Sequence, residues 1–358
     1  MVTKRQPLQV VLFITAACNL HCKVCFYWQE IAAHSRKEEL TLDELLLISK
    51  SMKRFPWLIL SGGEPFVRHD IPEIVECFVT NNRVGYVTIP TNGWHTETIV
   101  RTLEHVCHRH PSVSFNVDLS ILGMDSLHDE IVQLQGSFKR LTETYRSLKE
   151  LRNRYPNLSM GAIVTICLYN QDSVGDILSN IVHTFSFNSL VLAKARGSTR
   201  LPDAAQVDPK LYRSACHRLE GLIKSGKVLG FPGIIGTVIQ GKDVLLHRVI
   251  AEISEGRGYR MPCHAGRVSV VISEEGKVYP CELRKMELGD LRKAGMDFQS
   301  IWSGPRADEV RRAIHDSHCF CTHECNLTMN ILVNPRLVMK AIKGACTITL
   351  SRCIRKTF

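Results

Sequence analysis

Strand-like and helix-like segments alternate six times in about the first two hundred residues, and this alternation limits the possible folds more than any other feature. Short apolar runs, typical of buried strands, are separated by longer segments with a helical period. Such repeats predict parallel strands joined by crossover helices. Six repeats are too few for a closed eight-stranded barrel, so we expect an α/β fold built on a partial, TIM-like (β/α)6 barrel. The expected strands are 10–15, 57–60, 84–89, 113–120, 160–167 and 189–193.

Candidate site residues come at or just after the ends of these predicted strands. They are Cys18, Gly62, Asn92, Ser120 and Arg196. In parallel α/β sheets, ligands bind at the carboxyl ends of the strands. The sequence therefore predicts that these positions share one site.

Three cysteines follow the first predicted strand at the spacing C-x3-C-x2-C: Cys18, Cys22 and Cys25. Thiolates are the usual protein ligands of iron–sulfur clusters, and three of them can hold three irons of a four-iron cluster while the fourth iron stays open. A zinc site is the alternative, but a closed structural zinc site needs four ligands, and only His21 and His34 are near. Disulfide bonds would imply an oxidising compartment, whereas cysteines clustered at each end of the chain favour metal.

A glycine-rich loop, S-G-G-E-P at 61–65, follows the second predicted strand. Alone, two glycines after a strand are typical of a tight turn. Glycines without a Cβ also let a ligand approach the backbone, and the loop carbonyls and Glu64 can accept hydrogen bonds from an ammonium group. The cysteine triplet followed by this loop resembles the radical S-adenosylmethionine (SAM) superfamily.

This resemblance implies the cofactors and the chemistry. In that family a reduced [4Fe–4S] cluster passes an electron to the SAM sulfonium, and the resulting 5′-deoxyadenosyl radical takes a hydrogen atom from the substrate. The cysteine triplet would hold the cluster, and the amino and carboxylate groups of SAM would chelate its open iron. An external electron donor such as flavodoxin or ferredoxin is an implied partner. The residues expected to bind SAM are Gly62, Gly63, Glu64, Asn92, Ser120 and Arg196.

The resemblance continues along 119–138, where Ser120 would contact the ribose or the amino-acid end of SAM. A local hydrogen bond is the alternative role for this hydroxyl. Val24, Leu122 and the pair at 132–133 stand where the family usually has an aromatic residue, an acidic residue and Arg-Gly. The contacts usual at those positions are therefore not carried over to this chain.

A second group of cysteines lies near the C-terminal end: Cys263, Cys281, Cys319, Cys321 and Cys325. Segments 268–272 and 277–281 predict a β-hairpin with Gly276 in its turn. A hairpin with a cysteine at each base, followed by a dense cysteine cluster, resembles the auxiliary-cluster extension called SPASM, or its shorter form, twitch.

This second resemblance implies one auxiliary [4Fe–4S] cluster with one cysteine to spare. Cys263, Cys281 and Cys325 match best. Either Cys319 or Cys321 is the fourth ligand, with a slight preference for Cys321. A zinc knuckle that includes His323 is the alternative. An auxiliary cluster could accept an electron from a substrate radical or bind the substrate.

Cys167 lies near the end of the fifth predicted strand, on the same face as Gly161, Ile163 and Thr165 by the strand period of two. If that face looks into the barrel, its thiol can donate a hydrogen atom to a substrate radical. Such a donor would let the enzyme invert a stereocentre without net oxidation. The commoner role of such a residue is that of a small buried apolar side chain.

Four regions are expected along the chain. Residues 1–201 form the barrel, 202–262 a linker and helical segment, 263–330 a small cysteine-rich α+β domain, and 331–358 a basic tail.

The net charge is +10, and residues 326–358 contain six basic residues and no acidic one. Val338, Ala341 and Ala345 share one face of a predicted helix, and Lys340 and Lys343 lie on the other. An ordinary terminal helix explains this pattern, but contact with an anionic membrane or a phosphate-bearing substrate is the sharper alternative. Among residues 326–358 no aromatic residue is interleaved with the basic ones, so the sequence gives no indication of nucleic-acid binding. No apolar run approaches the roughly 18 residues that span a bilayer, so we expect a cytoplasmic protein.

The sequence thus predicts a radical SAM enzyme with an auxiliary cluster. A sugar, a lipid-linked intermediate or another small biosynthetic molecule is the expected substrate, and a ribosomally made peptide is the alternative. A non-catalytic iron–sulfur or zinc scaffold is the alternative of another class. Net oxidation, epimerisation and bond formation all stay open.

Overall fold

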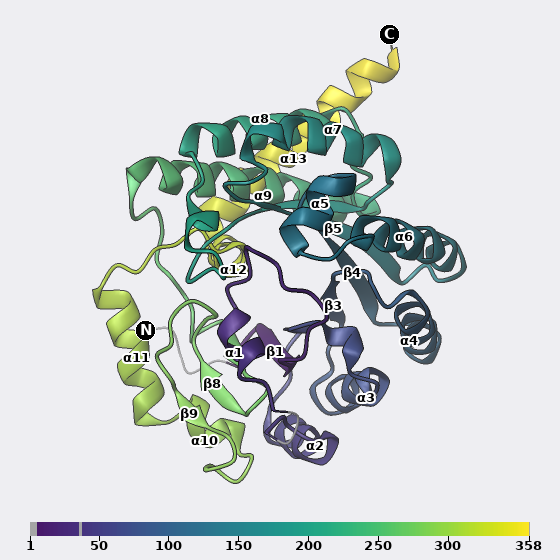
Figure 1. The fold of residues 1–358 in the computed structure, drawn as a ribbon. Coiled ribbons are helices and arrows are strands. Elements are labelled where there is room, and N and C mark those ends of the chain that lie inside the picture. Colours follow the sequence, from purple (N-terminus) through teal and green to yellow (C-terminus); the bar gives the residue numbers. More distant parts are fainter. Residues whose placement is uncertain (1–5, 36–37, 358) are drawn as a thin grey trace.

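A computed structural model describes residues 6–35 and 38–357, with side chains described as far as Arg352. Its centre is a nine-stranded sheet in the order β6-β5-β4-β3-β2-β1-β7-β8-β9 (Figure 1). Strands β1 to β6 pair in parallel with their neighbours, as the repeats predicted. The predicted α/β class and the partial barrel are therefore confirmed. The six strands are β1 (Gln9–Thr15), β2 (Trp57–Gly62), β3 (Tyr86–Thr91), β4 (Ser114–Ile121), β5 (Leu158–Ile166) and β6 (Ser189–Lys194).

Helices connect these strands and cover the outer face of the sheet (Figure 1). Helix α2 begins at a reciprocal capping box formed by Thr41 and Glu44. The connecting helices are α1 (Trp28–Ala32), α2 (Leu42–Ser51), α3 (Ile71–Asn82), α4 (Thr96–Arg109), α5 (Asp125–Val132), α6 (Ser137–Arg154) and α7 (Val174–Thr184).

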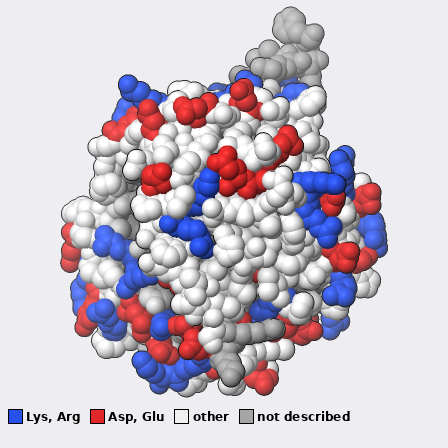
Figure 2. Space-filling view, viewed as in Figure 1, with Lys and Arg blue, Asp and Glu red and all other residues white. Residues whose placement is uncertain are grey.

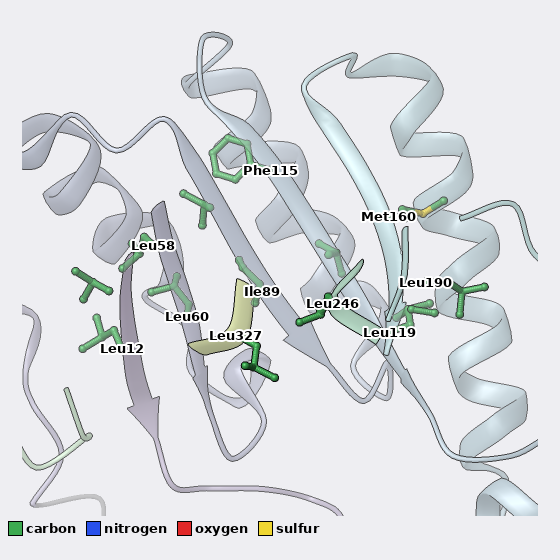
Figure 3. Close-up of a cluster of buried hydrophobic side chains, with 14 of the residues drawn as sticks. Leu12, Leu58, Leu60, Ile89, Phe115, Leu119, Met160, Leu190, Leu246 and Leu327 are labelled. Atoms are coloured by element: carbon green, nitrogen blue, oxygen red, sulfur yellow. The ribbon is translucent and has the colours of Figure 1, made fainter. Parts of the chain in front are cut away.

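The main core lies between the sheet and these helices. Alternate residues of each strand point outward into it, because side chains alternate across a strand. The inward residues line the barrel instead; Val11, Phe13 and Ile59 form a smaller cluster there. Figure 3 labels the outward strand residues Leu12, Leu58, Leu60, Ile89, Phe115, Leu119, Met160 and Leu190.

The cysteine-rich segment joins the barrel sheet. Strand β7 (Ser269–Ile272) pairs in parallel with β1, and β8 (Lys277–Tyr279) and β9 (Gly289–Asp290) follow as antiparallel strands. The predicted hairpin is confirmed, with Gly276 at a φ of 87° in its turn. Residues 263–330 are therefore continuous with the barrel through one sheet, whereas the sequence suggested a separate small domain.

Four helices lie together beyond the other edge of the sheet, at β6. They are α8 (Pro209–Lys224), α9 (Gly233–Glu252), α12 (Glu324–Leu332) and α13 (Pro335–Thr357). The buried His247 ring of α9 accepts a hydrogen bond through Nε2 from the Leu192 amide of β6, at 2.9 Å. The segment 228–241, which shows no period in the sequence, contains the first turns of α9.

Two shorter helices pack near the hairpin, α10 (Phe298–Trp302) and α11 (Pro305–Asp316). They divide residues 298–316, which are helical almost throughout. Pro305 begins a new helix, since proline is favoured in the first turn and cannot continue a preceding helix. None of the described helices is both long and apolar enough to cross a membrane.

Candidate metal centres and active site

The cysteine triplet forms a compact loop after β1. The Cys25 amide donates to the Cys22 carbonyl at 3.2 Å, and the Leu20 amide donates to Cys18 Sγ at 3.5 Å. Burial raises the pKa of the Cys18 thiol to about 12, and the nearby Glu64 carboxylate and Cys25 thiol add to the shift. Burial, with the Cys18 and Cys25 thiols beside it, also raises the pKa of Cys22. The structure thus brings the three predicted thiols together.

The glycine loop packs directly against the segment that leads into this triplet. The Gly63 amide donates to the Thr15 carbonyl and the Glu64 amide to the Ala17 carbonyl, each at 2.8 Å. A Cβ on Gly62 would lie 2.2 Å from the Thr15 oxygen, and one on Gly63 would lie 2.2 Å from the Ala17 oxygen. We expected the glycines to leave space for a ligand. The structure shows that they leave space for the backbone just before the first cysteine.

The Glu64 carboxylate is buried and already has protein donors. It accepts hydrogen bonds from Thr91 Oγ1 (2.7 Å), the Asn92 amide (2.8 Å) and the Phe66 amide (3.2 Å). Burial raises its pKa to about 7 in spite of these bonds. Glu64 therefore fastens the ends of β2 and β3 together, and its predicted bond to an ammonium group remains a prediction.

Asn92 extends this connection to the cysteine loop. Its Nδ2 donates to Asn19 Oδ1 at 2.9 Å, and its own Oδ1 accepts from the Trp94 amide at 2.9 Å. Asn92 was predicted from its place after β3, whereas Asn19, between the first two cysteines, was not singled out. The structure thus places Asn92 beside the cysteine loop.

Arg200 is a residue that sequence reasoning missed. Its amide donates to the Cys25 carbonyl at 3.0 Å, and its charge lowers the pKa of all three loop thiols, although burial dominates each shift. The guanidinium lies over the Trp28 ring, 5.8 Å from its centroid. The sequence signal that could have identified Arg200 is a basic residue soon after the sixth strand. Arg196 was predicted on the basis of the same signal.

Two buried donors near the triplet lack partners among the described groups: Arg200 Nε and Asn19 Nδ2. Buried polar groups are normally hydrogen-bonded. Three facing thiols together with unused donors fit an anionic iron–sulfur cluster and the carboxylate of a ligand bound to it.

The structure places Arg196 elsewhere. It forms an ion pair with Glu324 at the start of α12, at 2.8 Å between Nη2 and Oε2, and Glu282 and Cys325 are close. Arg196 thus contacts the auxiliary segment, and its predicted contact with SAM remains a prediction.

Ser120 and Cys167 differ in their access to the barrel. Ser120 is partly exposed on β4, in register with Ile163 of β5. Cys167, just beyond β5, is fully buried and packs with Leu20, Leu122 and other apolar side chains. This packing fits the commoner role of Cys167, and its hydrogen-donor role remains a prediction.

Four of the five C-terminal cysteines interact through their thiols. Cys263 and Cys319 share a hydrogen bond, which with Arg284 nearby lowers the pKa of Cys319. Burial raises the pKa of Cys321 to about 11, and the Cys281 and Cys319 thiols contribute to that shift. Cys319 and Cys321 therefore both join Cys263 and Cys281, whereas the sequence left one of them as the spare.

Cys325 has different neighbours. Its Sγ, a carboxylate oxygen of Glu282 and a ring nitrogen of His323 all lie within 4.8 Å of one another. His323 Nε2 and Glu282 Oε2 are 2.7 Å apart. Burial raises the pKa of Cys325, with Glu282 and Glu324 as the largest charged contributors. Cys325 thus has other neighbours than the four thiols above, and its predicted role as a cluster ligand remains a prediction.

The cysteine triplet follows the carboxyl end of β1. Cys263 precedes β7 and Cys281 follows the antiparallel β8, so these two lie at the end of β7 that pairs with the start of β1. Figure 2 shows the face viewed in Figure 1: charged side chains gather toward the rim, and much of the centre is uncharged. A substrate that approaches this centre would meet few surface charges.

Comparisons with known proteins agree with this geometry. The profile of the radical SAM superfamily matches residues 12–181, and that of an iron–sulfur cluster-binding SPASM domain matches residues 263–326. The chain belongs to the radical SAM superfamily. Its cofactors are therefore SAM, a [4Fe–4S] cluster and an auxiliary iron–sulfur cluster of the SPASM type.

Two curated relatives share moderate identity with parts of the chain. The sporulation killing factor maturation protein SkfB of Bacillus subtilis is 28% identical over 188 residues, which are 51% of this chain and 41% of SkfB. The pre-heme d1 synthase of Dinoroseobacter shibae is 28% identical over 216 residues, 57% of this chain and 48% of that protein. The chain thus spans less than half the length of each.

Solved structures share the fold. A structure of anSMEcpe with bound AdoMet has a TM-score of 0.60 at 17% identity and covers 98% of both chains. Streptococcus suis SuiB bound to the precursor peptide SuiA has a TM-score of 0.61 at 15% identity and covers 86% of this chain and 67% of SuiB. At such identities the likeness establishes the architecture alone.

Proposed function

We propose that the chain is a peptide-modifying radical SAM enzyme that works through two separate sets of thiols. Cys18, Cys22 and Cys25 would hold the cluster that binds SAM. When bound, this cluster and SAM supply the reductive cleavage and the removal of a hydrogen atom from the substrate. The observation that carries the proposal is the three-thiol loop at the end of β1, apart from a second four-thiol set.

The surrounding residues position this loop and balance its charge. The Gly63 and Glu64 amides tie it to β2, and Asn92 holds Asn19 within it. Arg200 supplies a positive charge beside all three thiols, which favours their deprotonated form and offsets the negative charge of a bound cluster. These residues fix the geometry in which an open metal position can meet a ligand.

The second set would hold the auxiliary cluster, with Cys263, Cys281, Cys319 and Cys321 as ligands. Four protein ligands leave no iron open, so this set suits electron transfer better than direct binding of substrate. An enzyme that removes a hydrogen atom, and then passes one electron to the auxiliary cluster while one proton leaves to solvent, would give a product oxidised by two electrons, as bond formation within a peptide requires.

The substrate class rests on the relatives. SkfB is named for the maturation of a killing factor, and SuiB binds a precursor peptide. The matches to GTP 3′,8-cyclases cover between 22% and 41% of the chain, compared with 51% for SkfB. A peptide is therefore preferred over the sugar or lipid-linked intermediate expected from the sequence, and the broad uncharged centre of Figure 2 suits a peptide without strong charge.

The test co-produces the enzyme with short open reading frames encoded beside its gene and examines the peptides by mass spectrometry. Loss of a pair of hydrogen atoms is the expected change, and it should vanish in a Cys18→Ala variant. In parallel, purified enzyme reduced by flavodoxin should release 5′-deoxyadenosine from SAM. SAM cleavage with no change in any peptide would refute the peptide substrate but keep the enzyme class. No cleavage at all would point to a scaffold.

A further inference from the structure

Two distant segments with no acidic residue meet on one side of the fold. Residues 221–242 include Lys224, Lys227 and Lys242, and residues 326–358 carry six basic residues; neither segment has an Asp or Glu, although Lys224 and Lys242 pair with the flanking Glu220 and Asp243. Helices α9 and α13 pack together so closely that a Cβ on Gly241 would lie 2.1 Å from the Ala341 carbonyl oxygen. The two segments therefore form one continuous surface.

The outward side of α13 combines basic and apolar groups. Arg336, Met339, Lys340, Lys343 and Leu350 are all exposed, at spacings that place them along one stripe of the helix. Ala341 and Ala345 on the opposite side are buried against α9. This confirms the amphipathic pattern of α13 and shows that exposed apolar side chains lie among the basic ones on its outward side.

The first turn of α9 adds the most exposed apolar side chains of the described part of the protein. Ile234 is 85% exposed and Ile235 is 77% exposed. Leu229, just before this turn, and Leu350 of α13 are also exposed. Exposing two adjacent isoleucine side chains to water costs free energy. Exposed apolar patches of this kind mark interaction sites.

The two apolar parts lie at the same end of the helix pair. Figure 1 shows α13 running antiparallel to α9, with its last turns beside the start of α9 and projecting past the neighbouring helices. Arg352 confirms the contact: its Nη2 donates to the Ile223 carbonyl at 2.7 Å and to the Val228 carbonyl at 3.3 Å. We call Leu229, Ile234, Ile235 and the exposed stripe of α13 the α9–α13 surface.

We propose that the α9–α13 surface docks on a bilayer that contains anionic phospholipids. Exposed isoleucine and leucine side chains would enter the headgroup region, while Arg336, Lys340 and Lys343 meet lipid phosphates. The complementarity of charge selects this occupant, because Arg336, Lys340 and Lys343 are exposed and α13 carries no acidic residue to pair with them. The proposal is independent of the substrate class.

Docking there would turn the active site away from the bilayer. The Leu229 and Gly230 amides donate to the Phe187 and Asn188 carbonyls, each at 3.0 Å, just before β6 begins. The cysteine loop lies at the opposite, carboxyl end of the parallel sheet. The docked enzyme would therefore take its substrate from the aqueous side, which separates membrane binding from a lipid-linked substrate.

The test measures co-sedimentation of the full, cluster-loaded protein with phosphatidylcholine vesicles, with and without phosphatidylglycerol. We expect binding to the anionic vesicles that weakens as salt rises. The pair Ile234→Asp and Ile235→Asp, and the pair Lys340→Glu and Lys343→Glu, should each lower the partition coefficient by about tenfold or more. All four side chains are exposed, so iron content and SAM cleavage should not change.

Matched controls lie on other helices. Leu47→Asp on α2 replaces another exposed apolar residue, and Lys139→Glu with Lys149→Glu on α6 makes the same change in net charge. These variants should bind as the parent does. Absence of binding to anionic vesicles, or equal losses in controls and test variants, would overturn the proposal. A parent that dimerises, and stops dimerising with the two aspartates, would assign the surface to a second copy instead.

Discussion

The cysteine loop after β1 and the C-terminal cysteine segment hold metal ligands in different ways. The first loop is short in sequence and is fastened by backbone hydrogen bonds from Gly63 and Glu64 to the residues just before Cys18. The second set gathers thiols from three separated places: Cys263, Cys281, and the 319–321 segment. A local loop has its geometry set by neighbouring residues, whereas a dispersed set depends on the whole fold to bring its members together.

The largest expected effect comes from removing the local set. The triple variant Cys18→Ala, Cys22→Ala and Cys25→Ala should lose about four irons and all SAM cleavage, since no other described thiols lie in this loop. Iron analysis and release of 5′-deoxyadenosine from anaerobically reconstituted protein measure both. Cys346→Ala, which removes an exposed thiol of α13, is the control and should behave as the parent. Residual cleavage in the triple variant would contradict the assignment.

The dispersed set gives a sharper test, because sequence and structure disagree there. Cys319→Ala and Cys321→Ala should each lower the auxiliary iron, whereas Cys325→Ala should keep it, since the Cys325 thiol lies beside Glu282 and His323. Electron paramagnetic resonance of the reduced proteins distinguishes the two clusters. Loss of the auxiliary signal in Cys325→Ala, with retention in Cys319→Ala, would restore the ligand set favoured by the spacing.

The difference between the regions also explains what the sequence could predict. The six strands, the triplet and the hairpin were predictable, because each depends on periodicity or on residues close in the chain. The pairing of β7 with β1 and the first turns of α9 were missed. They depend on tertiary contacts, such as the His247 bond to β6, that leave no local pattern.

Arg200 and Cys325 show the same limit at the level of single residues. The sequence analysis had identified the segments that contain these two residues. The side chains that they contact, however, lie far away in sequence. The Trp28 ring near Arg200 and Glu282 near Cys325 could not be identified from spacing. Residues that meet across the fold need the structure.

A further prediction concerns the backbone contact that holds the first loop. Gly63→Ala should destabilise the protein by about 2 kcal/mol or more and lower the occupancy of the first cluster, because its Cβ would collide with the Ala17 carbonyl. Gly85→Ala is the control, since a Cβ there meets no atom within 4 Å. Urea unfolding and iron analysis measure the two effects. Normal iron content with weak SAM binding would mean that the glycine instead leaves room for the ligand.

The smallest effect at neutral pH is expected at His247, which joins α9 to β6. Burial lowers the pKa of His247 to about 4, although Asp243 and Glu324 oppose the shift. An unfolded histidine takes up its proton near pH 6.5, so between these values the unfolded state binds more protons and stability falls as the pH falls. The loss of folding stability should reach about 3 kcal/mol near pH 4.

In His247→Gln this loss of stability at low pH should shrink, because glutamine takes up no proton, while its amide oxygen can still accept a hydrogen bond from the Leu192 amide. His183→Gln, an exposed control on α7, should keep the dependence of the parent. Parent and variants carry the same clusters, so the difference between their urea midpoints from pH 7.5 to 4.5 isolates the histidine. Equal slopes in His247→Gln and the parent would show that the α9 edge does not limit stability in acid, and would point to His128, whose pKa burial also lowers to about 4.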